Sequence, residues 1–140
     1  IDSLLDAFNN VMGFVLMFGM AVTGISLFVG GVGVMNIMFV SVTERTREIG
    51  IRKAIGAKRR AILQQFLLES TMICLVGGAL GVALSFGVAL AIDRFVLPAA
   101  VSLPIVVLAL TVSVAVGVIS GFIPAWRASR LHPIDALHYE

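Results

Sequence analysis

Charged residues divide this chain into three long uncharged stretches joined by short polar segments. No Asp, Glu, Lys or Arg occurs in residues 7–43, 70–92 or 95–126. Each stretch is longer than the ~20 residues that a helix needs to cross the hydrocarbon core of a bilayer. None has the polar face that a helix at the surface of a soluble protein carries. The pattern therefore predicts an all-α membrane protein with three transmembrane helices.

The composition supports the same class and argues against a buried bundle in a soluble protein. Of the 140 residues, 59% are hydrophobic and 13% are charged, whereas soluble domains average about 45–50% apolar and about 25% charged residues. The single cysteine, Cys74, lies in the second stretch. It excludes an internal disulfide and a multi-cysteine metal site.

The uncharged stretches also set the expected element boundaries. From the N-terminus we expect an amphipathic lead-in helix at 1–10, a span at 11–42, a polar helix at 43–56, a helix entering and crossing the membrane at 58–93, a short link at 94–103, a span at 104–126 and a tail at 127–140. The first stretch is too long for one perpendicular crossing, and we expect it to protrude on the outer side. Ser41 and Glu44 have capping-box spacing, which allows a helix to start or bend there, and Gly56 suits a helix stop.

Basic residues are concentrated in one segment. Seven of the ten Lys and Arg residues lie within residues 43–60, and the tail adds Arg127 and Arg130. Residues 1–10 contain none, and the link contains only Arg94. Because short cytoplasmic loops carry the excess of Lys and Arg, residues 1–10 are expected outside, and the polar helix and the C-terminus in the cytoplasm.

The polar helix carries more than charge. Glu48 precedes Arg52 by four residues, the favourable order for an ion pair along a helix. Its apolar positions are Ile49, Ile51, Ala54 and Ile55. A simple solvated loop does not need such a surface, so we expect something to dock there. A protein partner and the anionic inner leaflet, to which each basic residue contributes about 1 kcal/mol, remain equal alternatives on these grounds.

Small residues recur at every fourth position in the later spans, and such stripes let helix backbones approach closely in lipid. The helix-packing residues that we predict are Gly77, Gly81 and Ser85 in the second span, and Ser113, Gly117 and Gly121 in the third. The third-span stripe also includes Ala109 and Ala125.

The chain lacks the common signatures of catalysis and cofactor binding. It contains no GxxxxGK[ST] and no HExxH motif, and no span holds an Asp, Glu, Lys, Arg or His. The glycine-rich segment 29–36 lacks a glycine at the third glycine position of the dinucleotide fingerprint G-x-G-x-x-G, and it lacks the strand that precedes that motif. His132 and His138 fit surface histidines better than metal ligands. We therefore expect no enzyme activity and no bound cofactor in this segment, and no nucleic-acid binding.

Two segments nevertheless resemble a known family. The pattern ERxREIGIRKAIGA begins at Glu44, and PAxxASRLxPxxAL begins at Pro124. Together with LVGGALGVALS between them, they are similar to the C-terminal transmembrane region of MacB-type permeases, within the FtsX-like family of ABC transporters. The resemblance covers about Met12 to Glu140. The residues that stand where the family pattern places them are Gly50, Gly56, Pro124, Ala125, Ala128, Pro133, Ala136 and Leu137.

The resemblance implies a larger assembly. The three spans would be the family's second to fourth, residues 1–10 the end of an extracytoplasmic stalk helix, and residues 43–56 a cytoplasmic coupling helix that contacts an ABC ATPase domain or subunit. ATP and Mg²⁺ would bind that ATPase. The expected contact residues are Glu44, Arg45, Arg47, Glu48, Gly50, Ile51, Arg52, Lys53, Ile55 and Gly56.

The family further implies a bacterial cytoplasmic (inner) membrane protein that forms a homodimer or a pair of FtsX-like permeases, together with a periplasmic adaptor and an outer-membrane channel. The expected function is the permease part of an ATP-driven transporter that passes ATPase motion to an extracytoplasmic domain, for export of an antibiotic, a peptide or similar cargo. One alternative is a mechanotransmitter that activates or extracts an extracytoplasmic partner, as FtsX and lipoprotein-release systems do. Another is a structural membrane module whose basic helix rests on lipid.

Overall fold

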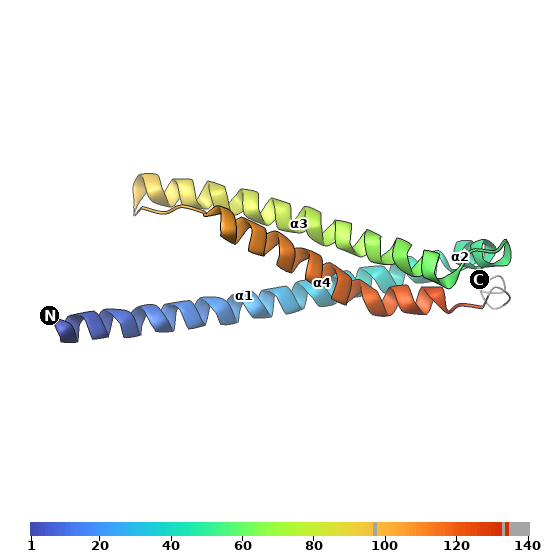
Figure 1. Cartoon of the computed structure of the whole chain (residues 1–140), viewed down its shortest axis with the longest axis horizontal. Helices are drawn as coiled ribbons and strands as arrows, with labels where there is room; N and C mark the ends of the chain where they lie inside the picture. The colour runs from blue at the N-terminus through green and yellow to red at the C-terminus, as the bar shows by residue number, and fades with distance from the viewer. Residues whose placement is uncertain (97, 133, 135–140) are drawn as a thin grey trace.

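Four helices make up the described part of the chain. The computed structural model describes residues 1–96, 98–132 and 134. Within them lie α1 (Asp2–Glu44), α2 (Thr46–Ala54), α3 (Arg59–Phe95) and α4 (Leu103–Ser129), and no strand. Helices α1 and α4 run in one direction and α3 in the other, while the short α2 lies at the end where α1 stops and α3 starts (Figure 1). The family-pattern positions Pro133, Ala136 and Leu137, and also His138, lie outside the described residues.

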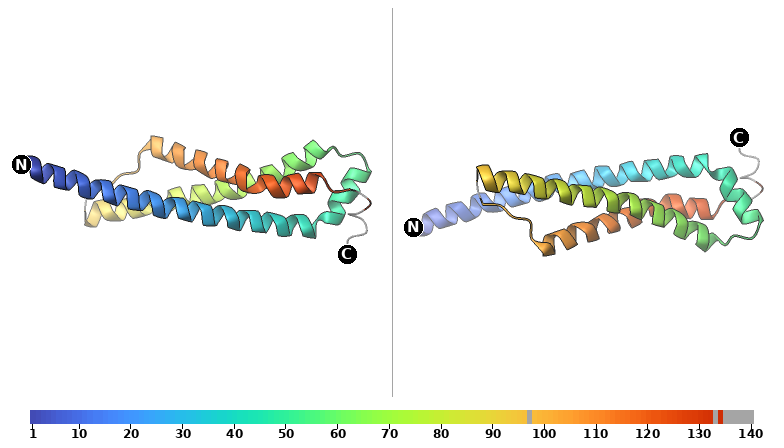
Figure 2. Two further views of the ribbon diagram at one scale, coloured as in Figure 1. Left: turned by 90° about the horizontal axis from the view of Figure 1, so that it is seen from below. Right: turned by 90° about the horizontal axis from the view of Figure 1, so that it is seen from above.

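The three long helices confirm the expected fold class. Helices α1, α3 and α4 have 43, 37 and 27 residues, and each is long and apolar enough to cross a membrane. At 1.5 Å per residue they measure about 65, 55 and 40 Å, against a hydrocarbon core of about 30 Å. The N-terminal end of α1 extends past the ends of α3 and α4 opposite α2 (Figures 1 and 2). Protrusion of this end from the bilayer on the outer side stays a prediction.

Helix α4 lies between the other two long helices. It packs most extensively on α3, less on α1, and α1 touches α3 at few points. Residues 1–30 of the chain are all exposed, and Gly31 is the first buried position of α1. From α2 outward, α1 therefore diverges from the α3–α4 pair (Figure 1).

Small residues allow the close approach of α4 to α3. A Cβ on Gly117 would lie 2.8 Å from the Cα of Thr71, and a Cβ on Gly121 would lie 2.5 Å from the Cβ of Ser70. Ser70 Oγ donates a hydrogen bond of 2.9 Å to the Gly117 carbonyl. The third-span stripe predicted from the sequence thus lies in the α3–α4 contact.

The second-span stripe lies outside the α3–α4 contact. A Cβ added to Gly77 or Gly81 would meet no atom of the described residues within 4 Å, and Ser85 is exposed. The contact instead falls on the neighbouring Gly78, where a Cβ would overlap the side chain of Ser113. Spacing identifies a stripe on α3, but α4 packs against the adjacent face. Packing of Gly77, Gly81 and Ser85 against another chain or segment stays a prediction.

Several boundaries also differ from the expected ones. Residues 1–10 and 11–42 form one uninterrupted helix, and α2 is shorter than the expected 43–56. Ser41 is not an N-cap, because α1 runs through Ser41, but α1 does end at Glu44, and the N-cap of α2 is Arg45 without a side-chain cap bond. Helix α4 extends three residues beyond Trp126 into the expected tail. The link between α3 and α4 is closed by the backbone N–H of Ala99, which donates to Asp93 (3.1 Å).

The buried apolar core gathers at the α2 end of the molecule. Its members are Met38 and Val42 of α1, Ile49 of α2, Ile62 and Phe66 of α3, and Ala125 and Ala128 of α4. Every helix contributes to it. Because fully burying a large apolar side chain stabilises by about 1.5–3 kcal/mol, this core fixes the position of α2 on the ends of the three long helices.

Candidate docking surface around the short helix α2

Helix α2 begins and ends at well-defined joints. Arg45, with φ −102° and ψ 12°, is the only residue between α1 and α2. The hydroxyl of the buried Thr46 donates to the carbonyls of Val42 and Thr43, both at 2.9 Å. At the other end Gly56 has φ +105°, which glycine adopts without the steric cost of a side chain.

The hydrogen bonds at Gly56 complete a Schellman motif. The N–H of Gly56 donates to the carbonyl of Lys53 (3.1 Å), and the N–H of Ala57 donates to the carbonyl of Arg52 (2.9 Å). These bonds satisfy two carbonyls that a helix C-terminus leaves without partners. The stop expected at Gly56 is confirmed, and the chain then enters α3 with Lys58 at its N-cap.

Arg45, between α1 and α2, forms ion pairs with two glutamates. Its Nε lies 3.3 Å from Glu48 Oε2, its Nη1 lies 3.2 Å from Glu69 Oε2 on α3, and its Cζ lies 5.3 Å from the centre of the Phe66 ring. The hydrogen bond from Arg45, followed by its charge, lowers the pKa of Glu48. Since a carboxylate with a lowered pKa loses its stabilising pairs only as the pH falls through that pKa, the network is complete at neutral pH.

Arg52 and Lys53 connect α2 to the other two long helices. Arg52 Nη2 lies 3.3 Å from Glu48 Oε1, as predicted from their spacing, and its Nη1 donates to the side-chain oxygen of Gln65 on α3. Lys53 Nζ donates to the backbone carbonyls of Ser129 and, at 2.6 Å, of Leu131. Burial, and then the charge of Arg59, lower the pKa of Lys53. Helix α2 is thus bonded to α3 and α4 as well as joined to α1.

These polar contacts set geometry more than they add stability. Ion pairs between partly exposed side chains are typically worth about 0–1 kcal/mol each, whereas Ile49 beneath them is only 3% exposed and packs in the core. Burial of the core residues supplies the free energy that holds α2 against the long helices, and the charged side chains fix the rotation of α2 about its axis.

The expected contact residues therefore divide into two groups. Arg45, Arg52 and Lys53 are half-buried in bonds within the chain, and Gly50 is buried. The side chains that remain exposed include Glu44, Arg47, Glu48, Ile51 and Ile55, and Gly56 is exposed beside them. We call Arg47, Ile51 and Ile55 the outward face of α2. Ile55 is 82% exposed, so it is available to a partner.

Sequence reasoning missed the internal partners of this site. Glu69 and Gln65 lie on α3, and the carbonyls that receive Lys53 belong to Ser129 and Leu131, 76 and 78 residues further along the chain. No local pattern signals such contacts. The positions of Gln65 and Glu69, four residues apart on one helix face, are the only available hint.

We expect Lys53→Met to loosen α2 from the end of α4. The methionine keeps the apolar stem but leaves two carbonyls without their donor, which costs about 1–3 kcal/mol when such groups are shielded from water. Hydrogen exchange measured by mass spectrometry should show faster exchange of the α2 amides. Arg47→Met, at an exposed position of the same helix, is the control, and equal exchange in both variants would contradict the role of Lys53.

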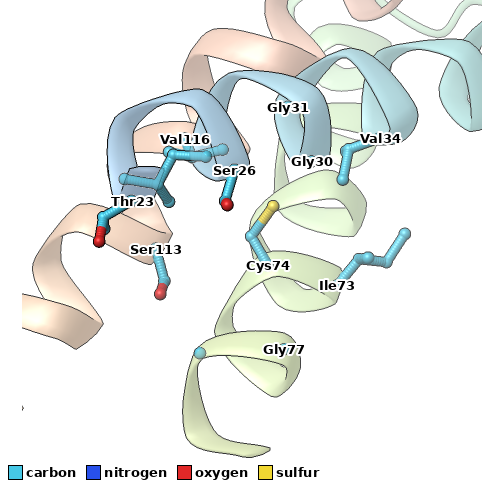
Figure 3. Close-up of a pocket in the computed structure, with 12 residues that line it drawn as sticks. Thr23, Ser26, Gly30, Gly31, Val34, Ile73, Cys74, Gly77, Ser113 and Val116 are labelled. Atoms are coloured by element: carbon cyan, nitrogen blue, oxygen red, sulfur yellow. The ribbon is translucent and has the colours of Figure 1, made fainter. Parts of the chain in front are cut away.

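A cavity between the long helices is the other candidate site. It has a volume of about 470 Å³ and is lined by residues of α1, α3 and α4, among them Ser26, Cys74, Gly77 and Ser113 (Figure 3). The hydroxyls of Ser26 and Ser113 already donate to carbonyls of their own helices, both at 2.9 Å. None of the described residues that line the cavity is charged. Among the described residues, no three His, Cys, Asp or Glu side chains gather as metal ligands would.

Comparison with known proteins places this arrangement in a family. The model of the FtsX-like permease C-terminal family matches residues 12–133. The chain is 52% identical over 133 residues to a protein from Rhodopirellula baltica named macrolide export ATP-binding/permease protein MacB, covering 94% of this chain and 19% of that protein. It is 58% identical over 118 residues to the protein of that name from Chromobacterium violaceum, covering 83% and 18%.

A third relative extends over nearly the whole chain. The protein named macrolide export ATP-binding/permease protein MacB 1 from Yersinia pestis bv. Antiqua is 49% identical over 141 residues, covering 99% of this chain and 22% of that protein. The chain therefore spans about a fifth of the length of the curated relatives that it matches.

Proposed function

We propose, since the chain belongs to the FtsX-like permease C-terminal family, that it is the permease part of an ATP-driven exporter and that α2 is its coupling helix. The names of the relatives combine export, ATP binding and a permease in one protein. In this proposal ATP and Mg²⁺ bind an ABC ATPase domain or subunit, and that ATPase contacts the outward face of α2.

One observation carries the proposal: α2 is fixed to all three long helices. It is joined to α1 through Arg45, bonded to α3 through Glu69 and Gln65, and bonded to α4 through Lys53. We infer that a force on the outward face moves α2 together with the helices to which it is bonded. It is passed to α1, whose length of about 65 Å exceeds the hydrocarbon core and reaches the opposite side.

The apolar spans favour mechanotransmission over conduction through the membrane. Intramembrane ionisable residues usually mark the path of a transported ion or substrate, and residues 7–43, 70–92 and 95–126 contain no Asp, Glu, Lys or Arg. The hydroxyls of the cavity between the helices bond to their own backbones. We propose that cargo is handled outside the membrane and that this segment supplies motion.

A second copy of the chain completes the proposed assembly. Exposure of α1 along residues 1–30 leaves an apolar helix surface that a homodimer would cover, and Gly77, Gly81 and Ser85 offer a further stripe for close packing. A periplasmic adaptor and an outer-membrane channel are the further partners of this proposal. The mass of the purified protein in detergent, measured by light scattering, tests it, since a monomer would contradict the homodimer.

The proposed location is the bacterial inner membrane with α2 in the cytoplasm. The basic residues of α2 and the start of α3 support this orientation. In a Cys74→Ala background, Ser3→Cys and Lys58→Cys should react with an impermeant thiol reagent from opposite sides of intact cells and inverted vesicles. Labelling of both cysteines from one side would contradict the orientation.

Photo-cross-linking tests contact between α2 and the ATPase directly. A photoreactive amino acid at Ile55, on the outward face, should cross-link to the ATPase in membranes, and one at Ile49, which is buried, should not. The expected yield at Ile55 changes when ATP is added, because the ATPase domains move. Cross-links from Ile55 to lipid alone would favour the lipid-resting module.

A further inference from the structure

Two arginines at the end of α4 lie outside the contacts of α2. Arg127 Cζ is 5.2 Å from the centre of the Phe39 ring on α1, and Arg130 Cζ is 4.4 Å from the centre of the Trp126 ring. Both arginines are exposed. Among residues 1–96, 98–132 and 134, no carboxylate pairs with either of them. Stacking on an aromatic ring fixes the plane of a guanidinium and leaves its N–H donors free for an anion.

The cluster of Phe39, Trp126, Arg127 and Arg130 lies at the border of the apolar part of α4. Ile119 and Ile123 precede the cluster on α4, and both are exposed. Ile123, Trp126, Arg127 and Arg130 follow Ile119 by four, seven, eight and eleven residues, so these residues lie on one face of the helix. The face thus changes from apolar to aromatic to basic toward the α2 end. Trp residues concentrate at the membrane–water interface, so Trp126 leads us to expect the guanidinium groups at the depth of lipid phosphates.

An apolar groove leads away from this cluster into the membrane. It has a volume of about 230 Å³ and lies between α1 and α4, with Val32 and Met35 on one side and Ile119 and Ser120 on the other. Met35 is one helical turn from Phe39, and Ser120 is two turns from Arg127. Ser120 is buried, and the other described residues of the lining are apolar. The groove and the basic cluster are therefore consecutive along the same two helices.

We propose that the groove and the cluster together bind one anionic phospholipid from the leaflet on the α2 side. The phosphate lies between Arg127 and Arg130, and one acyl chain follows the groove between α1 and α4. Basic pockets between transmembrane helices suit anionic lipid headgroups, and guanidinium groups form strong, directional hydrogen bonds with phosphate. A free phosphate would use the arginines but not the groove.

The position of the lipid gives it a structural consequence. Burial of α1 begins at Gly31, beside Val116 and Ser120 of α4, and the groove lies at this point. A lipid bound there fills the space between the helices beside the core that positions α2. This lipid site requires only that the helices lie in a membrane, and it does not depend on the proposed transport function.

Native mass spectrometry with defined lipids tests the site. The protein is expressed with every domain that its gene encodes, stripped of lipid in mild detergent, and titrated with phosphatidylglycerol or with phosphatidylcholine of the same acyl chains. We expect phosphatidylglycerol to bind about tenfold more tightly or better, given two basic residues near the headgroup. Arg127→Gln combined with Arg130→Gln should lose this preference, and the corresponding double Lys variant should keep most of it.

Two further variants separate the parts of the site. Arg59→Gln combined with Arg60→Gln removes the same charge from exposed positions at the start of α3 and should leave the preference unchanged. Ile119→Trp retains both arginines but narrows the groove, and it should weaken both lipids while the preference persists. Phosphatidylglycerol with a photoreactive acyl chain should label peptides that contain residues 27–35 and 116–120.

The results that would overturn the site are distinct. Preference that survives loss of Arg127 and Arg130, or that falls equally when Arg59 and Arg60 are replaced, would show diffuse attraction instead of a site. Labelling outside the α1–α4 groove would mean that the groove is covered by protein. Full competition by inorganic phosphate would reduce the cluster to an anion site without a lipid.

Discussion

Gly117→Leu is expected to unfold or severely loosen the α3–α4 pair. The first added carbon would lie 2.8 Å from the Cα of Thr71 and 3.1 Å from the carbonyl oxygen of Ser70. Both are backbone atoms that cannot rotate away, so the helices must separate. Overpacking of a well-packed contact costs about 1–3 kcal/mol, and separation would also break the bond from Ser70 to the Gly117 carbonyl. Thermal unfolding in detergent should show a large drop in the melting temperature.

Gly81→Leu is the matched control. It makes the same substitution in a membrane helix, but no atom of the described residues lies within 4 Å of its Cβ position. We expect little change in the melting temperature of a monomer. A comparable drop in both variants would contradict the packing in the structure. It would indicate that replacing a glycine lowers stability through the flexibility of the helix and not through a steric clash. If the drop occurs for Gly81→Leu only in the assembled protein, the α3 stripe packs against a second copy.

The contrast between these glycines shows what small-residue spacing can predict. Repeats of four identify a helix face on which close approach is sterically possible, and this was enough to find Gly117 and Gly121. The spacing does not tell which face of α3 receives them. That choice depends on the rotation of α3, which the core around Ile62 and Phe66 fixes. Gly78 was therefore missed, although it lies next to Gly77.

Local sequence patterns predict the helices and the contacts between residues near each other in the chain. They do not predict contacts between residues far apart in the sequence. The spans follow from uncharged stretches, the end of α2 follows from the backbone freedom of Gly56, and the pair of Glu48 with Arg52 follows from their spacing. Arg45 and Lys53, in contrast, resembled free docking charges because their partners lie far away in sequence, 24 residues for Glu69 and more than 70 for the end of α4.

This division changes which variant can test docking. Glu48 bonds Arg45 and Arg52, so its replacement would disturb the network inside the chain as well as any partner. Arg47 and Ile55 are exposed and, within the described ranges, belong to neither the ion pairs nor the buried core. Substitutions at these two positions should weaken docking without weakening the fold.

The second large effect is therefore expected for Arg47→Glu combined with Ile55→Ser. Interface residues that carry binding energy cost more than about 1 kcal/mol each when truncated, and buried anchors cost more than about 2 kcal/mol. Loss of both should separate ATP hydrolysis from motion of the membrane segment. The melting temperature should stay near that of the unaltered protein, because neither side chain contributes to the core.

Coupled ATP hydrolysis is the measurement that tests the proposed role of α2 most directly. The protein with all of its domains is reconstituted in liposomes, and the ATPase rate is measured with and without the membrane segment's cargo or extracytoplasmic partner. We predict that Arg47→Glu with Ile55→Ser reduces the coupled stimulation about tenfold or more, as the loss of two interface contacts implies. Arg60→Glu, which makes the same charge change at the start of α3, should keep it. Full stimulation in the double variant, with an intact fold, would contradict docking on the outward face of α2.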